Sequence, residues 1–264
     1  MKKKYEEILE TVVKTFLETH EPISSAMLKG RLPFDIAPAT IRYYFNKMVE
    51  RGELAQLHKS SGRIPTESTM KMYWRKHLRN FEVVCSAMEN LVEKAQEEDL
   101  YILLKPLKEN ELKAIERVAE KYLILIFDSD EYVIRYHTQM ESFLKDLIGY
   151  DINEIKQIAR DVGMISLYHK MRAKNDEEIT AINTEVIIKV AGQESNWGKR
   201  YVRSFLEGDV VEQLTPGLHF DPLLPKGFMA LSTEAVIDDR RTKMLCIGAI
   251  DHDFTKIFSS RKEA

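Results

Sequence analysis

A stretch of eight residues carries several side chains that form specific hydrogen bonds with nucleic-acid bases. Arg42 can pair bidentately with guanine O6 and N7, and Asn46 can pair with adenine. Their spacing of four residues places both on one side of a helix, one turn apart. A surface salt bridge of Arg42 with nearby acidic residues is the alternative. The candidate DNA-binding residues of this stretch are Thr40, Arg42, Tyr43, Asn46 and Lys47.

A second polar and basic cluster follows after about ten residues. Lys59 and Arg63 can contact DNA phosphates or the minor groove. Such contacts position a protein on the duplex without reading the DNA sequence. Gly62 fits a turn between them. The candidate DNA-binding residues here are His58, Lys59, Ser60, Ser61 and Arg63. Ser24 and Ser25, farther upstream, either cap a short helix or bind a phosphate at its N-terminus.

Catalytic and metal-binding chemistry has little support in the sequence. Asp251-His252-Asp253 is the one tempting cluster, but three ligands without a distant fourth are weak support for a metal, and a solvated turn is the alternative. Cys85 and Cys246 have neither metal nor redox spacing, which is typical of reduced thiols in a cytoplasm. No phosphate loop or nucleophile elbow occurs. We therefore expect a protein that is not an enzyme and that has no metal or cofactor.

Gly192, Trp197 and Gly198 allow a different reading, in which they line a small-molecule pocket of a ligand-sensing protein. A loop with one anchoring aromatic residue explains them equally well. Both interpretations stay open at this point.

Three helices and a hairpin are expected to position the two polar clusters. Apolar residues recur at helical spacing from Lys4 to Thr19, and Pro22 ends that helix. A short helix over residues 26–28 follows, capped by Ser24. A third helix begins at Pro38 and ends near Gly52. The strand Leu54–His58, a turn and a returning strand complete the pattern of a winged helix, which places its third helix in the major groove.

The distribution of charge agrees with a polyanion-binding N-terminal part. The 264 residues have a net charge of −3, but residues 1–80 hold 15 Lys and Arg against 9 Asp and Glu. The first 80 residues therefore carry a balance of +6 and the remainder one of −9, an asymmetry that points to nucleic acid. No apolar run reaches the ~20 residues of a membrane span. Glutamates follow the basic start where a signal peptide would be apolar.

Residues 67–110 are predicted to form a helical linker, since no glycine or proline occurs between Thr66 and Leu104. Apolar residues alternate in steps of four and three, as in a heptad repeat. The stripe packs either on a neighbouring domain or in a parallel dimeric coiled coil. Its members are Met70, Trp74, His77, Phe81, Val84, Met88, Leu91 and Ala95.

The remainder of the chain, 111–264, has mixed helix and strand character. Residues 140–180 are predicted to be mostly helical and to lie between strands, as an insertion would. The predicted strands are rich in β-branched and aromatic residues. They are Tyr122–Phe127, Tyr132–His137, Glu185–Ala191 and Leu245–Ile250. The whole chain is thus predicted to be an α+β protein.

Two motifs in this order resemble the heat-inducible transcription repressor family HrcA. They are Pro38-Ala-Thr-Ile-Arg42, preceded by Glu21-Pro-Ile-Ser-Ser25, and Ser61-Gly-Arg-Ile-Pro-Thr66. Leu245–Phe254 is similar to a C-terminal strand of the family. The recognition helix departs from the family at Ala37, where a serine cap is usual, and the C-terminal strand lacks the usual proline and arginine.

The resemblance implies a winged-helix DNA-binding domain over 1–66, a helical linker over 67–110, and a GAF-like regulatory and dimerisation domain over 111–264 with a helical insertion at about 140–180. It also implies a cytoplasmic homodimeric repressor of heat-shock (chaperone) operons. Its partners would be a double-stranded DNA operator with an inverted repeat and the bacterial chaperonin, with no membrane. A ligand-sensing winged-helix regulator of other operons is the alternative.

Overall fold

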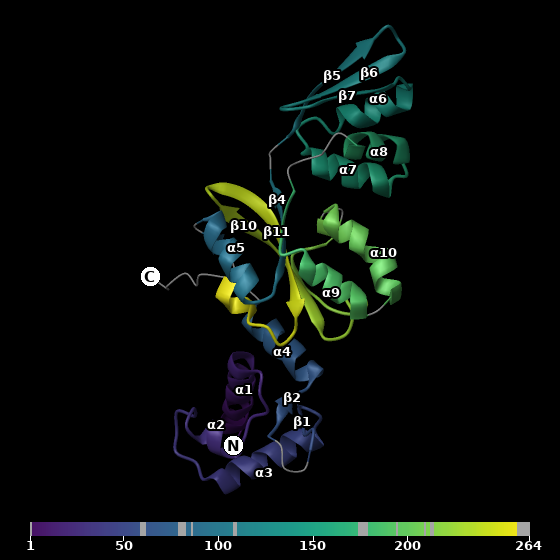
Figure 1. The fold of residues 1–264 in the computed structure, drawn as a ribbon. Helices are drawn as coiled ribbons and strands as arrows, with labels where there is room; N and C mark the ends of the chain where they lie inside the picture. The colour runs from purple at the N-terminus through teal and green to yellow at the C-terminus, as the bar shows by residue number, and fades with distance from the viewer. Residues whose placement is uncertain are drawn as a thin grey trace. The chain divides into compact units, whose positions relative to one another are not determined.

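The computed structural model of the chain contains both helices and sheets, as the α+β prediction requires (Figure 1). It describes residues 2–58, 62–78, 83–85, 87–107, 110–173, 179–193, 195–208, 210–211 and 214–257. Two compact units are present. The first combines Met1–Lys105 with Ile179–Ala264, and the second is Pro106–Glu178.

The N-terminal part of the first unit consists of three helices and a small hairpin. These are α1 (Lys2–Thr19), α2 (Ser25–Lys29), α3 (Pro38–Glu50), β1 (Leu54–Ala55) and β2 (Ile64–Pro65). All three helices agree with the prediction, whereas the paired part of the first strand ends at Ala55 rather than at His58. Their apolar faces meet in one core, made of Ile8, Val12, Ile23, Leu28, Ile41, Phe45, Met48 and Leu54.

The predicted continuous helix across 67–110 is wrong. The segment instead contains α4 (Glu67–His77), β3 (Val83–Cys85), α5 (Met88–Glu97) and β4 (Tyr101–Pro106). Residues 83–85 pair in parallel with a long strand of the main sheet, and β4 enters the middle of that sheet. Hydrogen bonds and burial in the sheet outweigh local helix propensity here.

Four residues of the apolar stripe face the core of their own chain, while Phe81 lies outside the described residues. Met70 and Trp74 of α4 and Leu91 and Ala95 of α5 are all buried in one cluster. This burial agrees with a packed linker, and it leaves these side chains unavailable as the seam of a coiled coil.

The main sheet has six described strands, in the order β3-β10-β11-β4-β8, with β9 also paired to β10. β8 is Thr180–Ile182, β9 is Gly217–His219, β10 is Phe228–Ile237 and β11 is Arg240–Ala249. The predicted strand at 245–250 thus lies within β11, apart from its last residue. β10 and β11 form a long antiparallel hairpin whose turn residues, Asp238 and Asp239, have positive φ angles.

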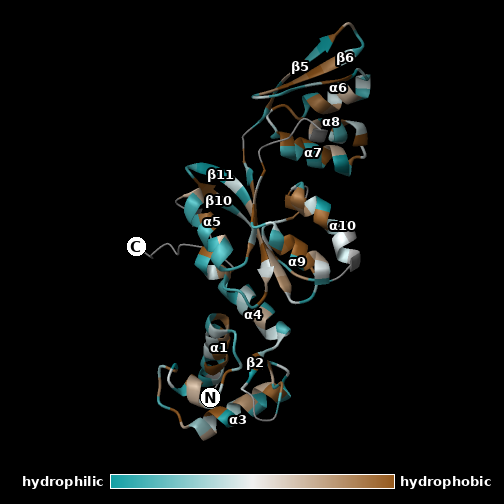
Figure 2. Ribbon diagram, viewed as in Figure 1, coloured by the Kyte–Doolittle hydropathy of each residue, from teal (hydrophilic) through white to brown (hydrophobic). Residues whose placement is uncertain are grey.

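Helices cover both faces of this sheet, so its central strands are apolar on each side. Tyr101 and Leu103 of β4 pack with α9 (Glu185–Gln193) and α10 (Ser195–Leu206). Leu100 and Ile102 face the opposite cluster with α4, α5 and η1 (Phe254–Ile257). The brown central strands in Figure 2 reflect this double burial.

The predicted strand at 185–191 is wrong, because these residues form helix α9. Val186, Ile187 and Val190 are buried at positions i, i+1 and i+4, which is a helical spacing. β-branched residues suggest a strand, but here a buried helix face accepts them.

The second unit packs a three-stranded antiparallel sheet against three helices. Its elements are β5 (Leu112–Val118), β6 (Tyr122–Phe127), β7 (Glu131–Arg135), α6 (Thr138–Lys145), α7 (Ile152–Asp161) and α8 (Ile165–Ala173). Strands at 122–127 and 132–137 were predicted, and both are present as β6 and β7. The unit begins at Pro106, whereas the sequence predicted an insertion from about 140. In the described residues β5, β6 and β7 pair only with one another, which explains why they belong with the helices that follow them.

Candidate nucleic-acid interface

The five candidate residues of the first cluster all lie on α3 and are exposed. Thr40, Arg42, Tyr43, Asn46 and Lys47 form its outer surface. The opposite face carries the buried side chains Ile41, Phe45 and Met48, which anchor the helix to the core. Pro38 occupies the first turn, and Ala37 provides no side-chain cap. The helix therefore presents a set of hydrogen-bond donors and acceptors from a rigid base.

An aromatic and cationic group lies on the same surface. Tyr43 is 55% exposed, and the Lys47 Nζ lies 4.7 Å from the centre of its ring. A cation–π contact of this kind holds both side chains together at the surface. Tyr44 meets Tyr43 edge to face with 5.8 Å between ring centres, and it meets Tyr5 of α1 at 6.1 Å.

Tyr5 also fixes the start of the hairpin. Its hydroxyl donates a hydrogen bond to Glu53 Oε2, and the Arg51 guanidinium lies 4.9 Å from its ring centre. Burial, together with the Glu53 carboxylate, raises the pKa of Tyr5 to about 12. This hydroxyl therefore stays protonated and keeps its donor role at any physiological pH.

The second cluster is only partly described. His58 is exposed, while Lys59, Ser60 and Ser61 lie outside the described residues. Arg63 is half-buried, and its Nη2 donates to Asn46 Oδ1 over 3.3 Å. Burial lowers the pKa of Arg63 from its ordinary value. The structure thus brings one residue of the hairpin against the exposed face of α3.

The segment around Ile23 and the hairpin form a tight pair. Ile23 N–H donates to Arg63 O over 2.8 Å, and Arg63 N–H donates to Ile23 O over 2.9 Å. A Cβ on Gly62 would lie 2.5 Å from Pro22 O, closer than side chains ever approach a carbonyl. Gly62 is therefore required by packing as well as by the turn, a role that the sequence did not reveal.

Ser24 behaves as a helix cap. Its Oγ accepts a hydrogen bond from Met27 N–H over 3.1 Å, and α2 has only five residues. Of the two interpretations left open for Ser24, the structure supports capping.

The hairpin is also joined to α4. Thr66 caps α4, donates to Gly52 O over 2.8 Å, and donates its backbone N–H to Glu53 O. Thr69 Oγ1 also donates to the same Glu53 carbonyl over 2.7 Å. The returning strand and the next helix are thus fixed to the turn after α3.

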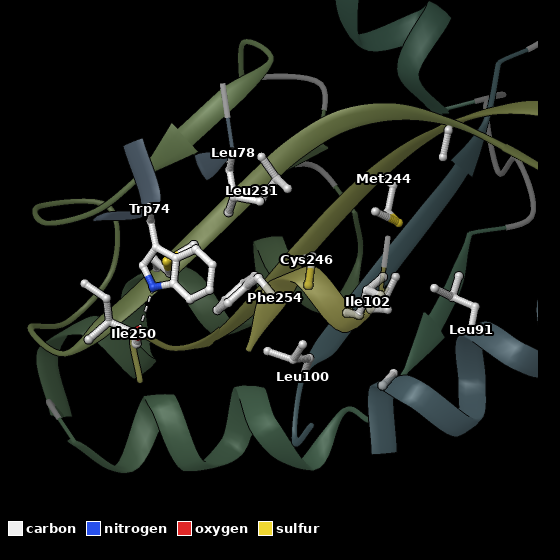
Figure 3. Close-up of a cluster of buried hydrophobic side chains, with 14 of the residues drawn as sticks. Trp74, Leu78, Leu91, Leu100, Ile102, Leu231, Met244, Cys246, Ile250 and Phe254 are labelled. Carbon is white, nitrogen blue, oxygen red and sulfur yellow. Dashed lines mark hydrogen bonds between the residues drawn. The ribbon is translucent and has the colours of Figure 1, made fainter. Parts of the chain in front are cut away.

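Helix α4 connects these elements to the main sheet. Trp74 is fully buried and its Nε1 donates to Ile250 O over 2.7 Å (Figure 3). Val13 and Leu17 of α1 lie in the same buried cluster. At the surface, Lys76 binds Glu10 of α1 over 2.6 Å. The N-terminal helices therefore share a core with the sheet.

The other candidate clusters of the sequence serve structural roles. Asp253 accepts hydrogen bonds from Thr255 at the start of η1, and the His252 ring lies 2.8 Å from Glu98 O. Across the described part of the chain, no group of three or more His, Cys, Asp or Glu side chains is arranged to hold a metal ion.

Of the three residues suggested for a ligand pocket, Trp197 and Gly198 are packed in the helix pair, whereas Gly192 has open space beside it. Trp197 is buried and donates from Nε1 to Leu223 O over 2.7 Å. A Cβ on Gly198 would lie 3.1 Å from the Ala191 Cβ, so this glycine lets α10 approach α9 closely. These residues support a helix pair rather than a cavity lining. No helix in the described ranges is long and apolar enough to cross a membrane.

Known proteins of one family match most of the chain. The family profile of the HrcA C-terminal domain matches residues 74–264. A Helicobacter pylori protein named heat-inducible transcription repressor HrcA is 32% identical over 264 residues, covering 98% of this chain and 95% of the relative. A Clostridium tetani protein of the same name is 29% identical and covers 72% of this chain and 53% of the relative. A crystal structure described as a hypothetical protein aligns with a TM-score of 0.49 at 17% identity, covering 96% of this chain and 92% of that one.

Proposed function

Because this chain belongs to the HrcA family, whose relatives are named heat-inducible transcription repressors, we propose that it is a DNA-binding repressor of heat-shock (chaperone) operons. The observation that carries the proposal is the outer face of α3. Arg42 and Asn46 stand one turn apart on it, both exposed, above a fully anchored inner face. The +6 balance of residues 1–80 supports the same assignment.

In this proposal residues 1–66 act as a winged helix. Helix α3 enters the major groove, where all four base pairs present different donor and acceptor patterns. Arg42 reads guanine, and Thr40, Tyr43 and Lys47 contact phosphates or thymine methyl groups. His58, Lys59, Ser60 and Ser61 of the hairpin bind the backbone and position the domain.

We further propose that two copies bind an inverted-repeat operator. One winged helix reads too few base pairs to find a site in a genome, so a homodimer on a palindrome is expected. The contacts that hold the dimer would come from the part of the chain after the winged helix, for which the sequence suggested one GAF-like domain over 111–264 and in which 106–178 forms a compact unit of its own. Light scattering at micromolar concentration, with and without operator DNA, tests this assembly. A monomer under both conditions would contradict it.

The direct test of DNA binding is a gel shift with full-length protein and the promoter regions of the chaperone operons of the host. Arg42→Ala should abolish most of the preference for the operator, since a bidentate base contact contributes about 1–3 kcal/mol of discrimination. Lys59→Ala should weaken binding to all sequences alike. An unchanged specificity ratio in Arg42→Ala would refute the assignment of α3.

The proposal extends to regulation by the chaperonin. If the folded repressor is marginally stable, chaperonin occupancy shifts its folded fraction by mass action. A change of about 1.4 kcal/mol in folding free energy alters the folded-to-unfolded ratio tenfold. Heat diverts the chaperonin to other clients, and the operon is released.

Operator binding at rising temperature, with and without chaperonin, tests this regulation. Chaperonin should raise the temperature at which operator binding is lost. Identical binding curves and an unfolding midpoint far above growth temperature would rule the mechanism out while leaving DNA binding intact. Ligand-dependent operator binding would instead favour a ligand-sensing regulator.

A further inference from the structure

Arg63 is held in place by the backbone on one side and contacts the exposed face of α3 on the other. Its N–H and C=O groups both bond to Ile23, and Gly62 lies so close to Pro22 that the chain has little room to move. The half-buried side chain reaches α3, where Nη2 lies 3.3 Å from Asn46 Oδ1. Because the backbone of Arg63 is anchored, its side chain contacts Asn46 at a fixed position.

The contact determines the orientation of the Asn46 amide. A guanidinium group has five N–H donors and no acceptor, so the amide atom that faces it must be the oxygen. The Nδ2 group of Asn46 is then left for solvent or for a ligand, since Asn46 is exposed and its hydrogen bond with Arg63 uses only Oδ1. A nearby positive charge also makes Oδ1 a poorer acceptor for a second donor.

We propose that Arg63 is a positioning residue that orients Asn46 to donate a hydrogen bond to a base acceptor in the major groove. This inference rests on the proposed function. The acceptors available there are guanine O6 and N7, thymine O4 and adenine N7, and at adenine the N7 acceptor lies beside an amino group that donates towards the same side chain. Bidentate pairing of Asn46 with adenine, which the sequence suggested, needs Oδ1 to accept from the adenine amino group, and Arg63 opposes that arrangement.

The environment of Arg63 favours this role over a phosphate contact. Its Nε atom is buried, and its pKa is lowered by burial, so less of this guanidinium is open to a phosphate than in a fully exposed arginine. Lys47 provides the contrast, because it is exposed on the same helix and lies over Tyr43. We therefore expect the removal of Arg63 and the removal of Lys47 to have different effects on DNA binding.

The experiment selects duplexes from a pool randomised over about 20 base pairs, two helical turns, with the full-length protein. The wild type is compared with Asn46→Ala, Asn46→Asp, Arg63→Ala and Arg63→Lys. Lys47→Ala is the matched control, since it removes a positive charge from the neighbouring surface and leaves the Arg63–Asn46 hydrogen bond intact. Thermal unfolding is measured for every variant.

In the wild type one base position should prefer guanine or thymine, and the four-base comparison at that position identifies which. Asn46→Ala should reduce the preference there roughly tenfold. Asn46→Asp retains the Arg63 partner but offers only acceptors, so the preference should move to cytosine or adenine, whose amino groups donate. Asn46 is exposed, so this variant keeps the fold.

Arg63→Ala should weaken the preference at the position that Asn46 reads and leave other positions unchanged, while Arg63→Lys, which still donates, restores part of it. In the Asn46→Ala background Arg63→Ala should have little further effect. Lys47→Ala should lower affinity for all duplexes alike and reduce the salt slope by about 1.

Two results would overturn the inference. One is a uniform loss of affinity in Arg63→Ala with a lower salt slope, which identifies a phosphate contact. The other is an unchanged base preference in Asn46→Asp. Failure of the wild type to select any sequence would instead refute the proposed function, so the two failures are distinguishable.

Discussion

Replacing Trp74 with phenylalanine keeps an aromatic ring in the core but removes the indole N–H. Trp74 is fully buried, and its Nε1 donates to Ile250 O over 2.7 Å. Its ring also meets Phe254 edge to face, with 5.6 Å between ring centres. Figure 3 shows these side chains within the cluster that joins α4 to the sheet.

Two losses determine the expected magnitude. A carbonyl oxygen left without its donor in a buried site costs about 1–3 kcal/mol. The smaller ring leaves a void, which costs roughly 1 kcal/mol more. We therefore expect Trp74→Phe to lower the free energy of unfolding by about 2–4 kcal/mol, a large part of the stability of an ordinary domain.

Urea denaturation followed by circular dichroism measures this change without depending on tryptophan fluorescence, which the substitution itself alters. Met72→Ala is the matched control, because Met72 lies on the same helix and is 53% exposed. The control should change stability by less than about 0.5 kcal/mol. If Trp74→Phe costs no more than Met72→Ala, the hydrogen bond and the packing at this joint do not contribute as the structure indicates.

Three further predictions concern other parts of the first unit. Gly62→Ala should cost about 1–3 kcal/mol, because its Cβ would strike Pro22 O, whereas Gly30→Ala should be neutral or slightly stabilising in the same denaturation assay. A hydrogen bond from Lys76 lowers the pKa of Glu10 from 4.5 to about 2, so its contribution, about 1 kcal/mol after allowance for solvent, should be full above pH 4.5 and disappear as the pH falls towards 2. Glu10→Gln should abolish that pH dependence, and Glu6→Gln, at an exposed position of α1, should leave it unchanged. Burial raises the pKa of the Cys246 thiol, so peptide mass spectrometry should find it unalkylated in the native protein and alkylated only after unfolding; rapid native labelling would contradict its burial.

Much of the N-terminal part was predictable because its signals are local. The apolar spacing of α1 and α3, Pro38 at the first turn of α3 and the cap at Ser24 depend on residues within a few positions of one another. The exposed position of the α3 candidates follows from the same periodicity. The HrcA relationship was likewise readable from two short motifs, and the comparisons confirmed it.

The contacts between those motifs were not predictable from the sequence. The pairing of Ile23 with Arg63, the close approach of Gly62 to Pro22 and the hydrogen bond from Arg63 to Asn46 join residues about 17 to 40 positions apart. A pattern of residue types indicates which hydrogen-bonding and packing groups the chain contains, but it does not indicate which of these groups contact one another in the fold.

The errors in the remainder of the chain have the same origin. The segment between Thr66 and Leu104 lacked glycine and proline and had helical spacing from Met70 to Ala95, and β-branched residues were dense at 185–191. The first segment nevertheless contains two strands and the second is a helix. In both places the local preference for helix or strand contributes less free energy than pairing in the sheet or burial of a whole face. The sequence by itself therefore determined the family and the helices that bear the candidate DNA contacts. The tertiary structure decided which segments entered the main sheet, because only there do residues such as 83–85 and 101–106 find the partners that satisfy their backbone hydrogen bonds.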